Sequence, residues 1–395
     1  MISKDRVIEL AEKLFPKVVH QRRYLHQHPE LSFKEFETSK FVAQQLDELE
    51  ITYKTGYVKT GIVAHVQGQN PHKKTFALRG DMDALPITEN TGLSFASVNK
   101  GIMHACGHDV HTSCVLGAAA ILKELSSEYE GTIKLIFQPG EEVLPGGASL
   151  MIKEGALANP RPSGIIGQHV YPQMTAGTVG FRKGMYMASC DEIHLHINGK
   201  GGHAAEPHRI NNPILAASDL TLKLNQLNEL GKKENIPTII SIGFIEGKGA
   251  TNIVPDQVYI QGTFRTMNEE WRGEIHQKIK AICKEIENTH NVQIENNVIK
   301  GYPFLKNDEE LTTRVQKYAV DLLGNENVVD LDLRMGGEDF SYYTQEIPGC
   351  FYRLGTSESN NPSTGLHTST FTVDESALKT GMALLAWIAI QELKQ

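Results

Sequence analysis

The chain has 395 residues, of which 40% are hydrophobic and 22% are charged, and its formal net charge is −8. This length exceeds a single ordinary core and predicts two domains. The acidic balance argues against a nucleic-acid partner, which requires a basic face to displace counterions. The apolar runs are shorter than the ~18 residues of a membrane span, and the N-terminus lacks a signal-peptide core. Five cysteines, sparse and odd in number, suit a reducing compartment, so we expect a cytoplasmic protein with no membrane partner.

Helical and strand patterns alternate in the first third of the chain. Apolar residues at helical spacing predict helices at 10–25, 35–49 and 110–125. Short apolar or β-branched runs predict strands at 62–66, 75–78, 132–137 and 164–168. This alternation is typical of a largely parallel sheet covered by helices.

The middle of the chain follows a different order. Strands are expected at 191–198, 238–246, 257–266 and 292–299, with helices at 213–230 and 269–287. This β-α-β-β-α-β order is ferredoxin-like. Because the sheet type changes here, we place an inserted domain at residues 187–299. The remaining domain is then discontinuous, comprising residues 1–186 and 300–395.

The densest group of chemically competent side chains runs from His104 to His111 and includes Cys106 and His108. A thiolate beside imidazoles suits zinc and related divalent ions. Asp109 stands among them and can orient a ring nitrogen. The alternative is a loop of surface histidines around one buried cysteine.

Two adjacent carboxylates, Glu141 and Glu142, follow the strand expected at 132–137, where active sites of α/β sheets usually lie. Adjacent carboxylates repel, so a cation should neutralise them unless they are simply solvated. Beside a metal ion, one can bind the ion while the other takes a proton from water. Asp81 and Asp83, spaced by two after another strand, are either partners of ligand histidines or caps of the next helix.

Isolated polar residues at strand ends and in glycine-rich loops complete the candidates. His169 ends a predicted strand and His367 follows a glycine near the C-terminus; each is either a metal ligand or structural. In the inserted domain, His203 stands on a glycine-rich turn and Asn252 follows another. Arg265 can clamp a carboxylate through two hydrogen bonds, or can form an ordinary surface ion pair.

Together these motifs resemble the aminoacylase and carboxypeptidase-G-like metallopeptidase family along nearly the whole chain. The matching strings, in order, are 26–31, 81–86, 104–112, 138–142, 201–208, 336–340 and 367–368. They match the amidohydrolase branch, which includes hippurate hydrolase, N-acetyl-diaminopimelate deacetylase and the plant auxin-conjugate hydrolases. The resemblance implies an α/β fold: a mostly parallel-sheet catalytic domain with an inserted ferredoxin-like α+β lid and dimerisation domain.

The resemblance also assigns roles to the candidates. The ligands of two divalent ions would be Cys106, His108, Glu142, His169 and His367. Zinc or manganese is expected, with cobalt or nickel as alternatives, and five ligands suit two ions about 3.5–4 Å apart. Glu141 would be the general base, and His203 would stabilise the oxyanion from a partner subunit. Asn252 and Arg265 would hold the substrate carboxylate.

One departure from the wider family narrows the match. Many relatives carry His-x-Asp after the second catalytic strand, whereas this chain has Asp81-Met82-Asp83, so its ligands must come from Cys106 and His108. That pattern matches the amidohydrolase branch and not the aminopeptidase branch. His104 and His111 are then spare imidazoles, and we expect them to support the ligands.

These features predict a homodimeric, metal-dependent amidohydrolase that cleaves N-acyl (acetyl, benzoyl or similar) L-amino acids. A dipeptidase or aminopeptidase acting on short peptides is the alternative, although no acidic motif for a free ammonium group stands out. A catalytically silent binding module is disfavoured because every ligand position and Glu141 are filled. A thiol hydrolase is disfavoured because a cysteine crowded by three histidines is better explained as a ligand.

Overall fold

The computed structural model describes residues 2–358 and 364–395, and the chain divides into two units. The main unit comprises Met1–Tyr186, Lys306–Asp332 and Asp339–Gln395, and the inserted unit comprises Met187–Leu305 and Leu333–Glu338. The insertion expected at 187–299 therefore differs from the inserted unit, which continues to Leu305 and gains a second segment. That segment joins because the Ala188 N–H donates to the carbonyls of Arg334 and Gly336, both at 3.1 Å. Among the described residues, no helix is long and apolar enough to cross a membrane.

An eight-stranded sheet forms the centre of the main unit, in the order β1-β2-β4-β3-β5-β16-β6-β15. The neighbours β4/β3, β3/β5, β5/β16 and β6/β15 are parallel, and the other three pairs are antiparallel. Strands β3, β4 and β16 are buried at every residue, as strands covered on both faces are. The expected mostly parallel sheet is therefore confirmed. The strands are β1 (Thr52–Tyr57), β2 (Gly61–Gln67), β3 (Thr75–Asp81), β4 (Thr132–Gln138), β5 (Ile165–Thr175), β6 (Val179–Phe181), β15 (Val328–Asp330) and β16 (Gly349–Ser357), with β7 (Gly184–Met187) and β14 (Leu305–Asn307) pairing separately.

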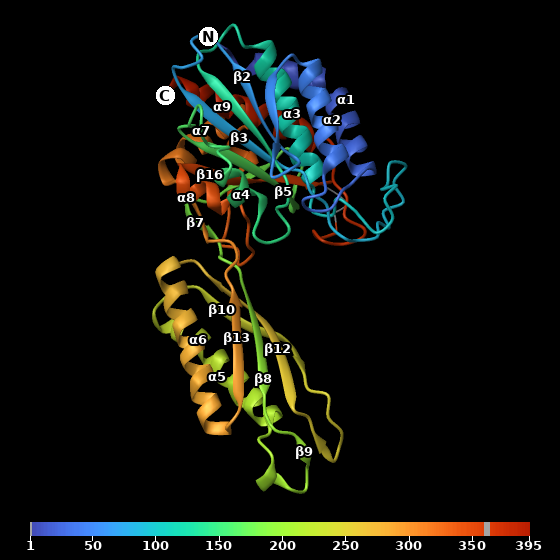
Figure 1. Cartoon of the computed structure of the whole chain (residues 1–395). Coiled ribbons are helices and arrows are strands. Elements are labelled where there is room, and N and C mark those ends of the chain that lie inside the picture. The colour runs from blue at the N-terminus through green and yellow to red at the C-terminus, as the bar shows by residue number, and fades with distance from the viewer. Residues whose placement is uncertain (1, 359–363) are drawn as a thin grey trace. The chain divides into compact units, whose positions relative to one another are not determined.

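Three helices, α1 (Lys4–Gln27), α3 (His108–Glu124) and α9 (Ala377–Lys394), pack together beside this sheet (Figure 1). A glycine lets them approach closely: a Cβ at Gly117 of α3 would lie 2.8 Å from Met382 Sδ and 3.0 Å from Val18 Cγ2. Helix α3 is buried along nearly its whole length, as its small apolar residues predict. The other helices of this unit are α2 (Phe36–Glu48), α4 (Gly147–Lys153), α7 (Glu309–Leu323) and α8 (Ser341–Glu346).

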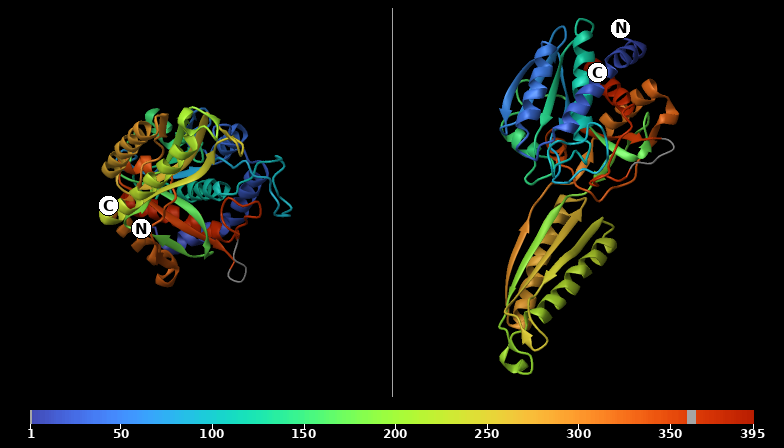
Figure 2. Two further views of the ribbon diagram at one scale, coloured as in Figure 1. Left: turned by 90° about the horizontal axis from the view of Figure 1, so that it is seen from below. Right: turned by 90° about the vertical axis from the view of Figure 1, so that its right-hand side faces the viewer.

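The inserted unit contains a four-stranded antiparallel sheet in the order β10-β12-β8-β13. Helices α5 (Pro213–Lys233) and α6 (Glu269–His290) pack on one face of that sheet, on the alternate residues Ile193, Leu195 and Ile197 of β8 (Figure 2). The element order and the strand order are ferredoxin-like. The strands are β8 (Asp191–Asn198), β10 (Thr238–Glu246), β12 (Gln257–Thr266) and β13 (Gln293–Ile299), and a separate ribbon consists of β9 (Gly202–His203) and β11 (Ile253–Val254).

Candidate metal centre

Chemically competent residues gather at the carboxyl ends of three neighbouring strands of the main unit. Asp81 ends β3 and Gln138 ends β4, and these two residues are partners in the parallel register. His169 lies on the next strand, β5, and α3 begins at His108. The carboxyl edge of a parallel sheet is where α/β proteins place their ligands.

His169 lies inside β5 and not at its end, which corrects the shorter strand expected from the sequence. The pairing of β5 with β3 stops at Gly167, but its pairing with β16 continues to Thr175. His169 therefore sits just past the last residue of β5 that pairs with β3, where pairing with β16 still fixes the backbone. The backbone that carries the His169 side chain is therefore held by β16 at the carboxyl edge of the sheet.

The five side chains expected to bind metal come together in the structure. The ligand atoms of Cys106, His108 and His169 all lie within 4.8 Å of one another, and so do those of Cys106, Glu142 and His367. Cys106 Sγ is 3.4 Å from His169 Nε2 and 3.3 Å from His367 Nε2. Residues from four separate segments of the chain thus surround one thiol.

The arrangement fits a cation. His108 Nε2 is buried and has no hydrogen-bond partner within the described part of the chain, and it lies 3.8 Å from Glu142 Oε1, which is itself 3.4 Å from His367 Nε2. Most buried polar atoms in proteins are satisfied, so an unsatisfied imidazole nitrogen facing a carboxylate is unusual. A thiolate, imidazoles and a carboxylate are also the donors that zinc and related ions prefer.

Two of the imidazoles expected to bind metal are oriented by an acceptor at their other nitrogen. His108 Nδ1 lies 3.2 Å from Asp83 Oδ1, and His169 Nδ1 donates to the carbonyl of Val170 at 2.8 Å. Each ring therefore turns its Nε2 lone pair toward the centre, the usual arrangement for a metal-binding histidine. Asp83 acts here as a partner of a histidine and not as a helix cap, since α3 is capped at Gly107 with no side-chain hydrogen bond.

The electrostatics of the centre favour positive charge. Hydrogen bonds to Cys106 and to Glu142 raise the pKa of His367 to about 10. Burial, and then the charge of Glu142, raises the pKa of the Cys106 thiol. Burial holds the pKa of His169 well below its ordinary value, so that ring stays neutral. A bound cation would replace these protons, because metal ligands must be deprotonated.

Gly107, between two of the ligands, meets a steric requirement. Its φ is +79°, and a Cβ at this position would lie 2.5 Å from Val170 Cγ2. Only glycine reaches this left-handed conformation without cost and leaves room for the neighbouring strand. The tight turn points both Cys106 and His108 into the centre.

The neighbouring histidines and Asp109 do not join the ligand set. His111 Nδ1 lies 2.6 Å from Asp81 Oδ1, and its Nε2 accepts the Val170 N–H at 2.9 Å, so both nitrogens are engaged in support. His104 is buried, burial lowers its pKa to about 4, and neither nitrogen has a hydrogen-bond partner in the ranges described. Asp109, in the first turn of α3, lies 2.9 Å from His26 Nδ1 on α1, so the ring nitrogen that it orients belongs to a histidine outside the His104–His111 group.

Arg79 is a supporting residue that local sequence patterns do not identify. Its fully buried guanidinium donates to Asp81 Oδ2 (2.6 Å), Asp339 Oδ1 (2.9 Å) and Gln138 Oε1 (2.9 Å). It thereby joins the ends of β3 and β4 to the segment before α8. The signal that could have identified Arg79 is a charged residue directly after the apolar run at 75–78, inside what proves to be strand β3.

The candidate substrate residues lie in the inserted unit, and they do not gather at one place within it. His203 is on β9, and the carbonyl of Asn252 accepts the Ala204 N–H at 3.0 Å, so these two are neighbours. Arg265 lies near the far end of β12, where its Nη1 donates to the Met335 carbonyl at 3.3 Å. Strand β12 begins beside the end of β8 that leads to β9, so its length separates Arg265 from His203.

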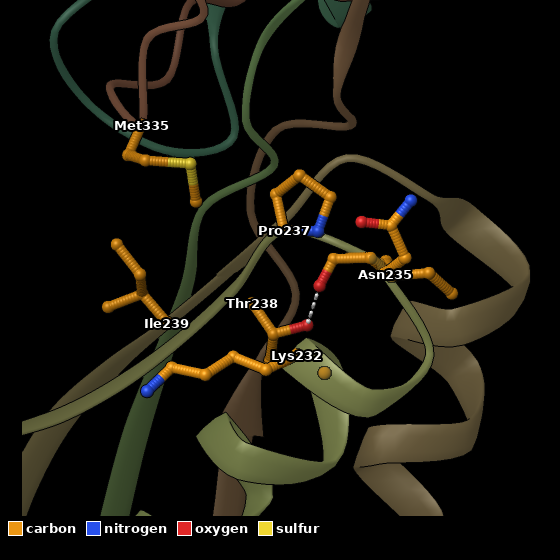
Figure 3. A pocket seen from close by; sticks show the side chains of 8 residues that line it. Lys232, Asn235, Pro237, Thr238, Ile239 and Met335 are labelled. Atoms are coloured by element: carbon orange, nitrogen blue, oxygen red, sulfur yellow. Dashed lines mark hydrogen bonds between the residues drawn. The ribbon is translucent and has the colours of Figure 1, made fainter.

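A pocket of about 440 Å³ in the inserted unit lies where α5 ends and β10 begins (Figure 3). Thr238 Oγ1 donates to the Ile236 carbonyl at its edge, at 2.9 Å. Lys232, its one charged lining residue, is paired with Glu229 at 2.6 Å. Its lining residues are Gly231, Lys232, Asn235, Ile236, Pro237, Thr238, Ile239 and Met335, none of them an imidazole or a carboxylate. The pocket therefore offers no hydrolytic chemistry.

Comparison with known proteins agrees with this geometry. The model of peptidase family M20/M25/M40 matches residues 77–391. The N-acetyl-L-cysteine deacetylase of Bacillus subtilis (strain 168) is 40% identical over 357 residues, covering 90% of this chain and 83% of the relative. IAA-amino acid hydrolase ILR1-like 4 of Arabidopsis thaliana is 36% identical over 396 residues, covering 99% and 89%. A crystal structure of a dinuclear metal binding peptidase of the M20 family from Bacillus subtilis matches with a TM-score of 0.83 and 33% identity, covering 97% and 99%. The chain therefore belongs to peptidase family M20/M25/M40 and is a hydrolase.

Proposed function

We propose that this protein hydrolyses the amide bond of N-acylated L-amino acids and releases a carboxylic acid and a free amino acid. The observation that carries the proposal is the convergence of five metal-ligand side chains beside the Glu141–Glu142 pair. The names of two relatives support the substrate class, since one is an N-acetylcysteine deacetylase and the other an IAA-amino acid hydrolase. The solved relative, described as a dinuclear metal binding peptidase, supports two ions.

Each residue near the centre would have a distinct task. Bound divalent ions would polarise the scissile carbonyl and lower the pKa of water. Glu141 is buried, with a carboxylate oxygen within 4.8 Å of ligand atoms of His108 and Glu142. This proximity supports the proposal that Glu141 takes a proton from water and passes it to the leaving nitrogen. Glu142 would be a ligand, and its backbone is held by its N–H, which donates to Asp83 at 3.0 Å.

The substrate residues are proposed to act from two copies of the chain. Arg265 and Asn252 would hold the substrate carboxylate and His203 the oxyanion, yet β12 separates Arg265 from His203 by roughly 25 Å at ~3.3 Å per residue. A homodimer formed through the inserted unit would let a partner supply His203 together with its neighbour Asn252. The edge strand β10, which exposes Phe244 and Ile245, is the surface we propose for pairing.

A mixing experiment tests that arrangement. His203→Ala and Glu141→Gln would each be inactive alone, but a hybrid dimer would hold one complete site. Random re-pairing should then restore about a quarter of wild-type activity if the histidine acts across the two-fold axis. No recovery in hybrids shown to form would exclude action across the dimer.

The activity itself is tested by amine release from N-acetyl, N-benzoyl and indole-acetyl amino acids. Chelated enzyme would be compared with enzyme reloaded with zinc, manganese, cobalt or nickel, which also ranks the ions. Glu141→Gln should lose about 10²-fold or more in kcat, on the order of 3 kcal/mol, with metal content unchanged. Glu128→Gln, an exposed and distant carboxylate, is the matched control. Near-normal turnover by metal-loaded Glu141→Gln would refute the assignment of the base.

Peptide hydrolysis is the second candidate, because the solved relative is described as a peptidase. Dipeptides with a free amine belong in the same panel. Turnover of dipeptides with silence on every N-acyl substrate would favour this candidate. Turnover of N-acyl substrates alone would exclude it.

A further inference from the structure

Glu35 is a fully buried residue at the N-cap of α2 whose carboxylate does not cap that helix. It is the N-cap residue of α2, yet its side chain makes no hydrogen bond to that helix. One oxygen instead accepts two backbone N–H groups, from Phe33 at 2.8 Å and from Gly140 at 2.9 Å. The other accepts the hydroxyl of Thr60 at 2.8 Å. The carboxylate therefore joins the segment before α2 to the loop that carries the catalytic pair.

The hydrogen bond from Gly140 fixes the residue directly before Glu141. The φ of Gly140 is +62°, and a Cβ there would lie 2.4 Å from Phe33 Cε1, so the two loops are in close contact. The carbonyl of Gly140 is also held, because it accepts the Gly147 N–H at 2.9 Å. With both its N–H and its carbonyl engaged, Gly140 sets the direction in which the Glu141 side chain leaves the backbone.

A second carboxylate holds the other side of the pair. Asp83 accepts the Glu142 N–H at 3.0 Å and the Ser32 hydroxyl at 2.6 Å. Glu35 thus accepts the amide N–H of the residue before Glu141, and Asp83, which also accepts the Ser32 hydroxyl, accepts that of the residue after it. Burial, and then the charge of Asp83, raises the pKa of Glu35 to about 7, so this carboxyl is retained where it is costly to ionise.

We infer that Glu35 is a positioning residue, which holds Glu141 in place through the amide of Gly140. This inference rests on the proposed role of Glu141 as the general base. What the site requires is an acceptor at the right reach, because the donors to Glu35 are two amides and a hydroxyl. Glutamine keeps that acceptor and lets its amide group meet the Thr60 hydroxyl, whereas aspartate keeps the charge but withdraws it by one methylene.

Three variants separate positioning from charge and from stability. We expect Glu35→Gln to keep at least half of the wild-type kcat, and Glu35→Asp to lose about 10-fold or more with little change in KM and unchanged metal content. Thr60→Val removes only the bond that does not reach Gly140, so it should lower thermal stability and leave kcat within twofold. Hydrogen exchange of a peptide spanning 138–147 supplies a readout without turnover: Glu35→Asp should speed its exchange, and Thr60→Val should not.

The outcomes are distinct. A Glu35→Asp enzyme with wild-type kcat and wild-type exchange would overturn the inference, as would Glu35→Gln losing as much as Glu35→Asp. An equal loss of kcat in Thr60→Val would reduce Glu35 to a purely structural residue. If the wild-type enzyme hydrolysed no amide at all, the proposed function would fail, and the exchange rates would still decide whether Glu35 holds the loop.

Discussion

Replacing Arg79 with methionine should destabilise the main unit strongly, because this guanidinium neutralises two buried carboxylates at once. Asp81 and Asp339 lie 2.6 and 2.9 Å from it, and all three side chains have no exposed surface. Methionine fills a similar volume but leaves both carboxylates without their cation. The pKa of Asp81, which burial alone would raise, is held well below its ordinary value by Arg79 and by His108 and His111, so it would remain charged in the wild type.

The magnitude follows from the cost of an uncompensated buried charge. Removing one partner of a buried ion pair costs about 3–5 kcal/mol, a large share of a domain's total of roughly 5–15 kcal/mol. Arg79→Met combined with Asp339→Asn should recover part of this loss, since one of the two orphaned charges is then neutral. Lys4→Met, which breaks a pair that is half exposed, should cost less than about 1 kcal/mol.

The assay uses the two tryptophans of the chain, which report separate units. Trp387 lies on α9 of the main unit and Trp271 on α6 of the inserted unit, and both are buried. In a Trp271→Phe background, urea unfolding followed by fluorescence reports the main unit alone. A loss below about 1 kcal/mol in Arg79→Met, or no recovery from the added Asp339→Asn, would refute the reasoning.

Three further predictions concern the turn, acid stability and the ions. Gly107→Ala should weaken metal affinity and lower the free energy of unfolding by about 1–3 kcal/mol, because the φ of Gly107 is +79° and Val170 occupies the Cβ position. Unchanged metal affinity in a competition titration would contradict this prediction. Despite burial, hydrogen bonds from His276 and Arg272 lower the pKa of Asp191, so the stability it contributes is present above pH ~3.9 and is lost as the pH falls below that value. Asp191→Asn should therefore reduce the loss of stability of the inserted unit at acid pH, measured by tryptophan fluorescence in a Trp387→Phe background. An unchanged acid dependence of stability would count against this prediction. Chelation should lower the free energy of unfolding of the main unit by about 2.7 kcal/mol if the ion is present at 100-fold its Kd, and should therefore lower its Tm. A Tm indifferent to chelator would argue that the native site is not loaded.

The sequence predicted the fold well where local patterns decide it. Strands β10 and β12 begin and end at the residues expected from the sequence, and the buried helix expected at 110–125 is α3. Strand β5 was cut short, because polar Gln168 and His169 interrupt its apolar run while backbone pairing with β16 carries the strand to Thr175. Pairing of that kind depends on a partner almost two hundred residues away and leaves little trace in the local pattern.

The site was predicted less evenly. The ligand-type residues could be identified from the sequence, because cysteine, histidine and paired carboxylates are rarely found so close together. Their supports could not, since Glu35 and Arg79 are ordinary charged residues whose partners lie far off in the chain, at Gly140 and Asp339. The segment 333–338 was placed outside the insertion because its attachment consists of backbone hydrogen bonds from Ala188, which any residue can make.

The supports explain why the matching strings contain so many residues that bind no metal. Asp83 touches His108 Nδ1 through one oxygen and accepts the Glu142 N–H through the other, so one carboxylate orients two ligands from different segments. An asparagine there would offer one acceptor and one donor to two groups that both donate, and one ligand would lose its partner. A ligand atom must lie within a few tenths of an ångström of its place, whereas the chain positions side chains that precisely only when each has a fixed acceptor behind it. The residues that set these acceptors are therefore as much a part of the candidate metal centre as the residues that would hold the ions.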